Sequence, residues 1–527
     1  MKSKYIKLIS LLILGLCISF LSLGSVTDDY KINDDSRIIY LVHQFEDKDL
    51  FKNDIMAEYT KSSQAPITTT LLYFYGFINN HLDFIVAGKI LSIVLFLAAV
   101  IYSYRLGEVI DKKTAFIFSL LVTLQMGITY YYFSGGLSRA FGWPLSLAFM
   151  YYLIKDSKLK MLIILIMQSL FYPPAFLISF GTYFLLNLHL QKFDFKKYKT
   201  LFLTAIIPLS ILILSFANKK NFGQMTNIFE AIAMPEYYTG GRVPVFRGSL
   251  PFTDSIKDTI YSIFNYQNTG ISNPIYLSSL VIFGIIGLIF LLYYGKKLLP
   301  KELHYMALVS VLAFATAFAL FFYLYFPNRY ISFTIPIYIF AATSAGLSKL
   351  LDTISSKKIK GLLLLSVIIL SLVFFVPKIP AAYTICGDKD MYATISALDK
   401  QAIIAGHPKE LDCIPIFTKH TVIFMDELTA PYHKEYYKVI KNRLNAFFSA
   451  YYSDDIVDMY AFCKKYNVSY VIINRDHFTY SYLNGRIYRE PFNIQIKEQL
   501  SNKNDFALSH YGGKTIFDDE TKYIINC

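Results

Sequence analysis

The sequence predicts a mainly α-helical integral membrane protein of about eleven transmembrane helices, followed by a small extracytoplasmic α/β domain. Of its 527 residues, 54% are hydrophobic and only 17% are charged, whereas about 25% are charged in ordinary soluble proteins. Long apolar runs recur from residue 6 to residue 376, and the composition then becomes that of a soluble protein. We therefore expect a polytopic membrane domain over residues 1–376 and a soluble domain over residues 377–527.

The net charge of +13 agrees better with a membrane protein than with a nucleic-acid-binding protein. The Lys and Arg residues gather in short loops between apolar runs, as the positive-inside rule expects of cytoplasmic loops. The sequence contains no motif for binding RNA or DNA, and no glycine-rich phosphate loop of the P-loop or Rossmann type. We expect no nucleic acid as a partner and no chemistry driven by ATP or NAD.

The first apolar run follows three lysines and ends near Leu23, which places the N-terminus in the cytoplasm. A cleaved signal peptide is the alternative, since small residues follow this run. The next apolar segment, 67–78, is too short to cross and should be an amphipathic or re-entrant helix. Further spans are expected near residues 84–104, 114–131, 140–154, 201–216, 274–294, 305–326, 330–348 and 361–376.

The apolar stretch 161–190 is too long for one span and short for two, and lysines flank both of its ends. Tyr172-Pro173-Pro174 lies in its middle. Because proline ends a helix, we expect two short helices that meet at a proline turn. Membrane proteins tolerate such a break where protein surrounds it or where it lines a cavity.

In this topology, the first outside loop covers residues 25–66 and a long outside segment covers residues 217–273. The last span ends outside, so the C-terminal domain is extracytoplasmic. Every basic loop then lies on the same side, as the positive-inside rule requires. We expect the protein in the bacterial cytoplasmic (inner) membrane.

The C-terminal domain alternates strand-like and helical segments, which predicts a small α/β fold. The strand-like segments are 402–405, 421–425 and 468–474, and the helical segments are 432–452 and 455–466. The domain also contains Cys386, Cys413, Cys463 and Cys527. Outside the cytoplasm these cysteines can form one or two disulfides, and free thiols are the alternative.

Carboxylates gather in the first outside loop, close to the expected membrane surface: Asp28, Asp29, Asp34 and Asp35. Neighbouring negative charges raise the pKa of one carboxyl group, which suits a general base near neutral pH. Paired carboxylates can also bind a cation. The alternative is a solvated acidic loop that only fixes the orientation of the chain.

An acidic pair shortly after the first span, followed by an aromatic residue, here Asn33-Asp34-Asp35 to Tyr40, resembles the GT-C class of membrane glycosyltransferases. That class includes protein O-mannosyltransferases, catalytic subunits of oligosaccharyltransferases and aminoarabinose transferases, and the likeness in architecture covers nearly the whole chain. The resemblance implies a catalytic carboxylate, here Asp34 or Asp35, and a sugar donor linked to a polyprenyl phosphate. It implies transfer of a hexosyl or pentosyl group to an envelope glycan, lipid or protein acceptor on the non-cytoplasmic face.

The phosphate leaving group of such a donor needs a cation, and arginine suits this role through bidentate contacts. Arg139 at the outer end of a span and Arg329 in the short outside turn 327–329 are candidates, as are Arg242 and Arg247 in the long outside segment. The alternatives are interface anchors for the first two and a plain surface loop for the others.

The next outside loop, 134–139, contains no acidic residue, although many GT-C enzymes carry a second acidic motif there. A divalent cation is therefore in doubt, and we assign no cofactor and no metal ligand. Two other functions stay open, a transporter or flippase of lipid-linked envelope material and a non-catalytic assembly or sensor protein. Transporters show repeats and charges inside the membrane, whereas this sequence has no clear repeat and spans almost free of charge.

Overall fold

The computed structural model of this protein describes most of the chain. The described residues are 2–24, 30–63, 67–188, 206–211, 213, 222–244, 275–320, 324, 327–383, 386–500 and 505–527. The expected span 201–216 therefore lies largely outside the described residues.

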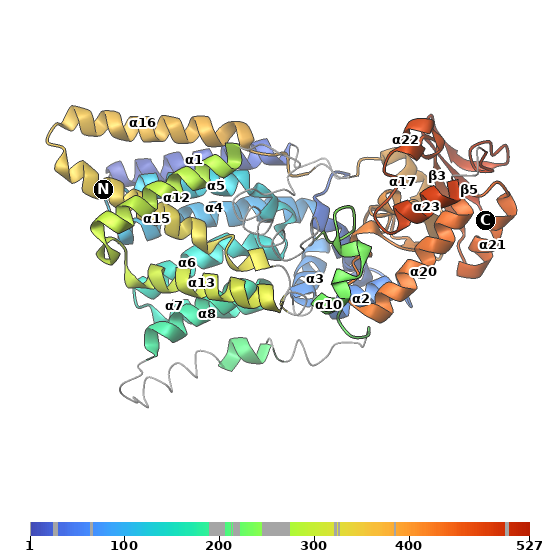
Figure 1. The fold of residues 1–527 in the computed structure, drawn as a ribbon, viewed down its shortest axis with the longest axis horizontal. Coiled ribbons are helices and arrows are strands. Elements are labelled where there is room, and N and C mark those ends of the chain that lie inside the picture. The colour runs from blue at the N-terminus through green and yellow to red at the C-terminus, as the bar shows by residue number, and fades with distance from the viewer. Residues whose placement is uncertain are drawn as a thin grey trace. The chain divides into compact units, whose positions relative to one another are not determined.

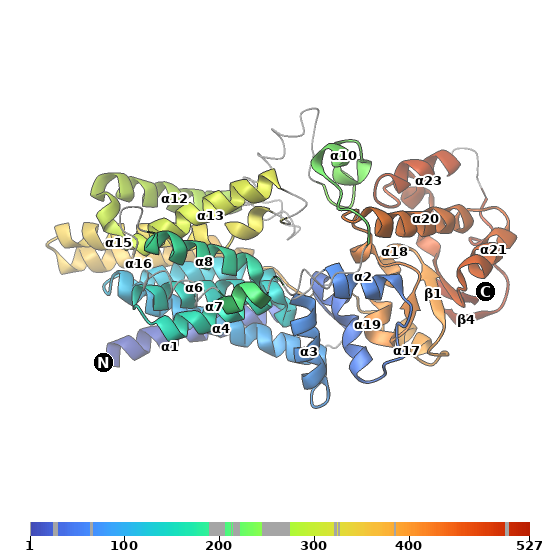
Figure 2. The ribbon, with the colours of Figure 1, turned by 90° about the horizontal axis from the view of Figure 1, so that it is seen from below.

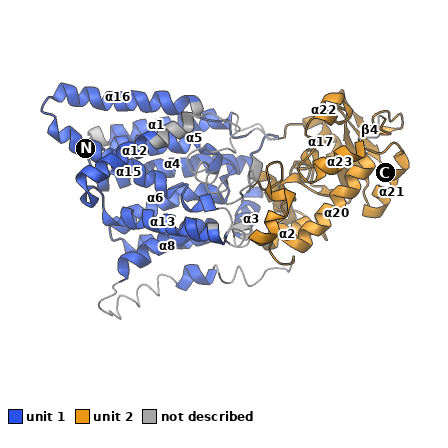
Figure 3. Cartoon of the chain, viewed as in Figure 1, with its two compact units in different colours: residues 1–35, 65–218, 258–385 blue, residues 36–64, 219–257, 386–527 orange. Residues whose placement is uncertain are grey.

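The chain forms two compact units (Figure 3). The helical unit comprises residues 1–35, 65–218 and 258–385. The α/β unit comprises residues 36–64, 219–257 and 386–527. Most of the first outside loop and much of the long outside segment thus group with the C-terminal residues. The division at residue 376 into two domains stays a prediction.

The helices of the helical unit follow the apolar runs of the sequence. They are α1 (Lys2–Leu23), α3 (Ile67–Asn79), α4 (Phe84–Ile110), α5 (Ala115–Ile128), α6 (Gly142–Ile154), α7 (Lys158–Phe171), α8 (Pro173–Asn187), α12 (Ile275–Tyr294), α13 (Lys301–Ala319), α15 (Thr334–Thr353) and α16 (Lys357–Phe375). Helix α4 packs against α1, α5 and α6, and α12 packs against α15 (Figure 1). Every residue of α5 except Phe116 is buried, as expected for a helix that is apolar on all sides.

Among the described residues, four helical segments are long and apolar enough to cross a membrane: Tyr5–Leu23, Phe84–Ile110, Thr334–Thr353 and Lys357–Phe375. A fifth span results if Ala115–Ile128 and Tyr130–Gly136, which meet at 72°, form one bent span. The expectation of a mainly helical protein with apolar spans is confirmed. The larger number of about eleven spans stays a prediction.

The proline turn expected within 161–190 is present. Helix α7 ends at Phe171, and α8 begins at Pro173 (Figures 1 and 2). The intervening Tyr172 has φ −149° and ψ 79°, outside the helical region, because the ring of a following proline disfavours helical backbone angles. Proline at the first position of α8 loses no hydrogen bond, since that N–H has no partner within a helix.

The α/β unit is built on a five-stranded sheet in the order β2-β1-β3-β5-β4. The strands are β1 (Ile403–Gly406), β2 (Thr421–Val422), β3 (Tyr470–Asn474), β4 (Thr515–Asp518) and β5 (Lys522–Asn526). Strand β1 pairs in parallel with β2 and β3, and β5 pairs antiparallel with β3 and β4. The central β3 buries Val471, Ile472 and Ile473, as a strand covered on both faces does.

Besides the sheet, the unit contains helices from distant parts of the sequence, and α17, α18 and α19 pack against strands of the sheet. The helices of the unit include η1 (Asp34–Phe45), whose first two residues belong to the helical unit, α2 (Ile55–Ser63), α10 (Ile228–Ile232), α17 (Lys389–Ser396), α18 (Pro408–Leu411), α19 (Ile414–Thr418), α20 (Lys434–Tyr451), α21 (Ile456–Tyr466), α22 (Tyr480–Asn484) and α23 (Phe492–Leu500). Strands β1 and β3 and helices α20 and α21 lie where the sequence predicts them. The strand expected at 421–425 is limited to Thr421–Val422, and the β4–β5 pair was not predicted.

All four cysteines of the C-terminal segment form disulfides, which resolves the alternative that the sequence left open. The pairs are Cys386–Cys413 and Cys463–Cys527. The second pair links α21 to the residue after β5. Among the described residues, Cys17 in α1 is a free cysteine.

Candidate functional site

The start of the first outside loop is fixed to the helical unit through Asn33. This side chain is buried, and its Nδ2 donates to the carbonyl oxygen of Ser134 at 3.0 Å and to its Oγ at 2.7 Å. Asp34 and Asp35 follow directly and form the first residues of η1. The side chains of both aspartates lie outside the described residues. The backbone that carries them therefore starts beside Ser134.

Ser134 opens a glycine turn, η3 (Ser134–Gly136), that lies against α4. Gly135 has φ 74° and Gly136 has φ 58°, a left-handed conformation that glycine adopts without a steric penalty. A Cβ atom on Gly88 of α4 would lie 2.7 Å from the carbonyl oxygen of Gly135. The turn and the helix can approach this closely because Gly88 has no side chain.

Two tyrosine hydroxyl groups hold this turn in place. Tyr75 of α3 donates to the carbonyl oxygens of Gly135 at 2.8 Å and Gly136 at 3.0 Å. The N–H of Gly135 donates to the hydroxyl oxygen of Tyr383 at 2.6 Å. These bonds satisfy backbone groups that would otherwise be buried without partners. These hydrogen bonds tie the turn to Tyr75 and Tyr383.

Arg139 lies close to the same turn. Its guanidinium carbon is 4.6 Å from the ring centroid of Tyr131 and 5.7 Å from that of Tyr132, within the range of cation–π attraction. The hydroxyl of Ser134 donates to the carbonyl oxygen of Tyr131 at 2.7 Å. Contacts therefore lead from Asn33 through Ser134 and Tyr131 to Arg139, and they bring two regions of the predicted site together.

The segment that follows Arg329 is linked to this region through Tyr132. Arg329 lies half-buried in the short helix η8 (Pro327–Tyr330). Three residues later, Ser332 accepts a hydrogen bond from the hydroxyl of Tyr132 at 3.4 Å, and Phe333 packs against Tyr132 with 5.2 Å between ring centroids. Tyr132 thus contacts both the Arg139 guanidinium and the segment that follows Arg329.

Lys89 is a residue of this cluster that the sequence interpretation overlooked. It belongs to α4, its side chain is fully buried, and its Nζ lies 5.4 Å from the ring centroid of Tyr383. We described the spans as almost free of charge, but a lysine inside the apolar run 84–104 is itself an indication of function, because a charged residue within a membrane span is costly.

In the α/β unit, Arg242 takes part in a buried ion-pair network. Its Nη2 lies 2.9 Å from Oε2 of Glu427, and its guanidinium also donates to the carbonyl oxygens of Asp426 and Glu427. The Glu427 carboxylate accepts a second bond from Arg37, which also pairs with Asp412. Phosphate binding by Arg242 stays a prediction, and Arg247 lies outside the described residues.

Burial and the neighbouring charges set the protonation of these carboxyl groups. Burial, helped by the negative charges of Asp426 and Glu427, raises the pKa of Asp412 above its usual value against the opposing effect of Arg37. Burial acts in the same direction on Asp426, but hydrogen bonds and charge from Arg489 hold the pKa of Asp426 below its usual value. Arg489 Nε and Nη2 donate to the two Asp426 oxygens at 2.8 and 2.5 Å.

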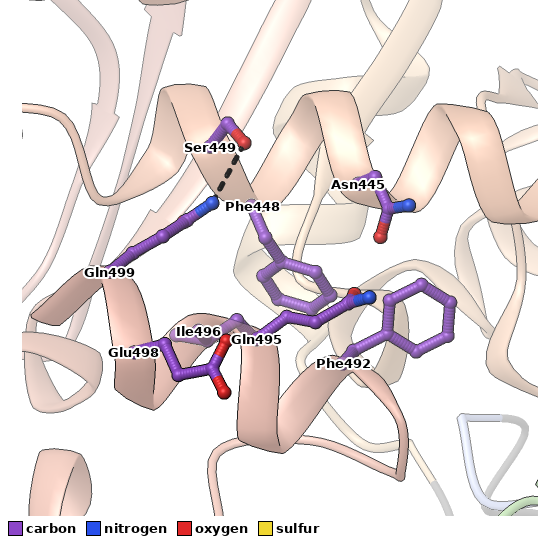
Figure 4. Close-up of a pocket in the computed structure, with 8 residues that line it drawn as sticks. All are labelled: Asn445, Phe448, Ser449, Phe492, Gln495, Ile496, Glu498 and Gln499. Atoms are coloured by element: carbon purple, nitrogen blue, oxygen red, sulfur yellow. Dashed lines mark hydrogen bonds between the residues drawn. The ribbon is translucent and has the colours of Figure 1, made fainter. Parts of the chain in front are cut away.

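A groove of about 500 Å³ lies between α20 and α23 of the α/β unit (Figure 4). Its lining residues are Asn445, Phe448, Ser449, Phe492, Gln495, Ile496, Glu498 and Gln499. The side-chain amide of Gln499 donates to the hydroxyl of Ser449 at 3.2 Å. None of the site residues predicted from the sequence lines this groove. Within the described part of the chain, no group of three or more His, Cys, Asp or Glu side chains could hold a metal ion.

Comparisons with known proteins add information about the fold. No family model matches the sequence, and no curated protein matches it. Three crystal structures of the oligosaccharyltransferase of Archaeoglobus fulgidus are similar in structure. The form tethered to an acceptor peptide with the NVT sequon has a TM-score of 0.52 at 13% identity, covering 93% of this chain and 72% of that chain. The apo form has a TM-score of 0.53 at 12% identity and also covers 93% of this chain and 72% of that chain.

The third structure, the complex with Zn and sulfate, has a TM-score of 0.50 at 12% identity and covers 93% of this chain and 70% of that chain. These values establish a shared fold over nearly the whole length. The resemblance to GT-C-class membrane glycosyltransferases, which the acidic pair and the span pattern suggested, is thereby confirmed as a likeness in fold.

Proposed function

We propose that this protein is a membrane glycosyltransferase. It moves a sugar from a polyprenyl-phosphate donor to an envelope glycan, lipid or protein acceptor on the non-cytoplasmic face. The fold that it shares with an oligosaccharyltransferase supports the reaction class. The main supporting observation is that Asn33, the residue before the acidic pair, is hydrogen-bonded to Ser134, which lies five residues before Arg139 in the chain.

The chemistry follows from these residue types. Asp34 or Asp35 accepts the proton of an acceptor hydroxyl group while the oxygen attacks the anomeric carbon of the donor sugar. The bond between the anomeric carbon and the phosphate oxygen breaks, and the phosphate leaves with the electron pair. Arg139 and Arg329 bind the phosphate and stabilise the negative charge that develops on it. Whether the transferred sugar is a hexose or a pentose does not affect this scheme.

The same proposal includes a topology of about eleven spans, with a cytoplasmic N-terminus and an extracytoplasmic C-terminal domain in a bacterial cytoplasmic membrane. The two disulfides support it, because disulfides persist in oxidising compartments. Tyr480, whose side chain is 87% exposed, offers a test. A membrane-impermeant maleimide should label Tyr480→Cys in intact spheroplasts, and labelling only after lysis would contradict this orientation.

The test of function compares a deletion strain with strains rescued by wild type, Asp34→Asn or Asp35→Asn. Mass spectrometry measures envelope glycans and polyprenyl-phosphate sugars in each strain. Deletion should remove one sugar from a glycan and let its lipid-linked donor accumulate. Since a general base contributes about 10²- to 10⁴-fold to a rate, at least one Asn variant should be expressed at the normal level and fail to rescue.

Asp49→Asn is the matched control, since Asp49 is an exposed residue of the same loop. It should rescue fully. If both Asn variants at positions 34 and 35 rescue as well as Asp49→Asn, the first-loop carboxylates are not catalytic, and the transporter or assembly function becomes the better explanation.

The arginine assignments have a separate kinetic test. Arg329→Lys and Arg139→Lys keep a positive charge but lose the bidentate geometry. Each should raise KM for the lipid-linked donor or lower kcat by about tenfold or more, with KM for the acceptor unchanged. Unchanged kinetics in both variants would assign these residues to anchoring alone.

A further inference from the structure

Lys89 occupies a position where a lysine is unexpected. It is the sixth residue of α4, which begins at Phe84, so it lies about 8 Å along the helix from that end at a rise of about 1.5 Å per residue. A lysine this near the end of a span can extend its side chain to the aqueous surface. This side chain is instead fully buried, with Nζ directed to the ring of Tyr383.

A buried ammonium group needs negative charge close to it. An unpaired ion in a medium of low polarity is strongly destabilising, and an aromatic ring compensates only a small part of that cost. A buried lysine inside a membrane unit therefore indicates a function, and its anionic partner has to be identified.

The surroundings of Lys89 lead to the first outside loop. Tyr383, over whose ring the ammonium lies, accepts a hydrogen bond from the N–H of Gly135. Ser134, the residue before Gly135, accepts two bonds from Asn33. Gly88, next to Lys89 in α4, lies against the same turn, since a Cβ atom on it would be 2.7 Å from the carbonyl oxygen of Gly135. The chain that leaves Asn33 continues as Asp34 and Asp35.

A second acidic residue near this end of α4 has a different role. Asp83 is the N-cap of α4, and its Oδ1 accepts from the N–H groups of Ile85 at 2.8 Å and Val86 at 3.0 Å. This exposed carboxylate is used to begin the helix. The two aspartates after Asn33 are therefore better candidates than Asp83 for the anionic partner of the buried Lys89.

We propose that Lys89 is a positioning residue that pairs with the carboxylates of Asp34 and Asp35. Its ammonium compensates one of their two negative charges, which leaves the other carboxylate to accept the acceptor proton. This inference rests on the proposed function, in which one of these aspartates is the base. In this scheme, Lys89 acts through the aspartates and does not itself contact the donor.

A double-mutant cycle on the purified full-length protein tests the pairing without reference to activity. Lys89→Met removes the cation from the proposed pair, and we expect the Tm of this variant to fall by at least about 5 °C. Adding Asp34→Asn or Asp35→Asn should recover at least half of that loss, because the unpaired charge is then removed. Lys89→Arg, which keeps the charge, should retain most of the wild-type Tm.

Lys113 supplies the control cycle. It forms an exposed ion pair with Asp352 at 2.5 Å, and such pairs contribute little, so Lys113→Met and Asp352→Asn should each change the Tm by about one degree or less and add independently. If the changes in Tm caused by Lys89→Met and by the Asn substitutions are additive in the same way, the proposed pairing is wrong. If Lys89→Met alone does not accumulate, folded protein in either double variant supports the pairing, and its absence in both overturns it.

Kinetics separate this inference from the proposed function. Lys89→Met should lower kcat for sugar transfer by about 10²-fold, with KM for the donor unchanged. A raised donor KM together with an additive cycle would assign Lys89 to the donor phosphate and overturn the pairing. If wild type transfers no sugar but the cycle is non-additive, the pairing holds and the proposed function fails.

Discussion

The helical unit and the α/β unit stabilise their buried polar groups in different ways. In the helical unit, tyrosine hydroxyls and an asparagine amide satisfy the backbone of a glycine turn, and Lys89 is a buried cation. In the α/β unit, ion pairs between arginines and carboxylates and two disulfides provide the cross-links. A bilayer offers no water to an imperfectly paired group. The charges of the α/β network are instead paired with one another, with Arg37 and Asp412 buried and Arg242 and Glu427 partly exposed.

This difference indicates how each unit should respond to change. Removing one charge from a dense network leaves its partners buried and unpaired, so the effect on the α/β unit should be large. The helical unit depends on close backbone approach, so added volume should matter more than lost charge at most positions. Lys89 is the exception, because it is a buried charge within the helical unit.

The largest expected effect is that of Arg37→Ala in the α/β unit. This substitution leaves the buried Asp412 without the arginine that pairs with it, whereas Glu427 keeps its ion pair with Arg242. Loss of one partner of a buried ion pair costs about 3–5 kcal/mol. Hydrogen exchange of the β3 amides in the full-length protein should become faster, by about tenfold for each 1.4 kcal/mol of stability lost.

Arg475→Ala is the matched control for Arg37→Ala. Arg475 pairs with Asp518 at 2.6 Å on the surface, where both side chains are more than 40% exposed, and an exposed pair is worth about 0–1 kcal/mol. Equal effects of the two substitutions would show that the network of Arg37 does not stabilise the α/β unit more than a surface pair does.

Removal of the Cys463–Cys527 disulfide should have the next largest effect. Replacing both cysteines with serine should destabilise the α/β unit by about 2–4 kcal/mol, because the cross-link restricts the unfolded chain. Thermal unfolding with and without a reductant measures this loss of stability. In the double variant, the reductant should have a smaller effect on the Tm than in wild type, because this disulfide is already absent. Cys17→Ser in the helical unit should leave unfolding unchanged, since Cys17 is a free thiol.

A smaller and pH-dependent effect is expected at Asp54. Burial raises the pKa of Asp54 from 3.8 to about 6, so the folded protein binds this proton more tightly than the unfolded chain. The resulting stabilisation is present below pH 4 and is lost as the pH rises to about 6. Since one pKa unit corresponds to about 1.4 kcal/mol, the full loss is at most about 3 kcal/mol.

Asp54→Asn should therefore raise the Tm at pH 8 and not at pH 4, because Asn can still accept the hydrogen bond from the N–H of Met56. Thermal unfolding across this pH range is the measurement. Asp49→Asn, at an exposed carboxylate, should show no such pH dependence. An increase in the Tm of Asp54→Asn at pH 4 as large as the increase at pH 8 would contradict the raised pKa of Asp54.

The smallest effect tests the helical unit. Gly88→Ala places a Cβ atom 2.7 Å from the Gly135 carbonyl oxygen, and this overpacking costs about 1–3 kcal/mol, partly offset by about 1 kcal/mol of helix propensity. Gly284→Ala in α12 is the control, since its Cβ would meet only Ile339 at 3.8 Å. A loss of sugar transfer in Gly88→Ala with normal transfer in Gly284→Ala would show that the contact between α4 and the glycine turn supports the site.

The sequence by itself determined much of the local structure. Apolar runs and basic loops gave the positions of most described helices, because helix formation in a membrane depends on a continuous apolar stretch. Pro173 determined the break between α7 and α8, because proline ends a helix without any tertiary contact. The alternation of strands and helices after residue 400 and the likeness to GT-C transferases also came from the order of residues alone.

Only the tertiary structure decided which distant residues meet. The pairing of the four cysteines, the β4–β5 pair, and the joining of Arg37 and Arg242 to the same Glu427 depend on contacts between segments far apart in the chain. Periodicity carries no information about such contacts. The same holds for Lys89, since its place in an apolar run was visible, but whether its side chain reaches the surface or turns toward Tyr383 depends on how α4 packs against its neighbours.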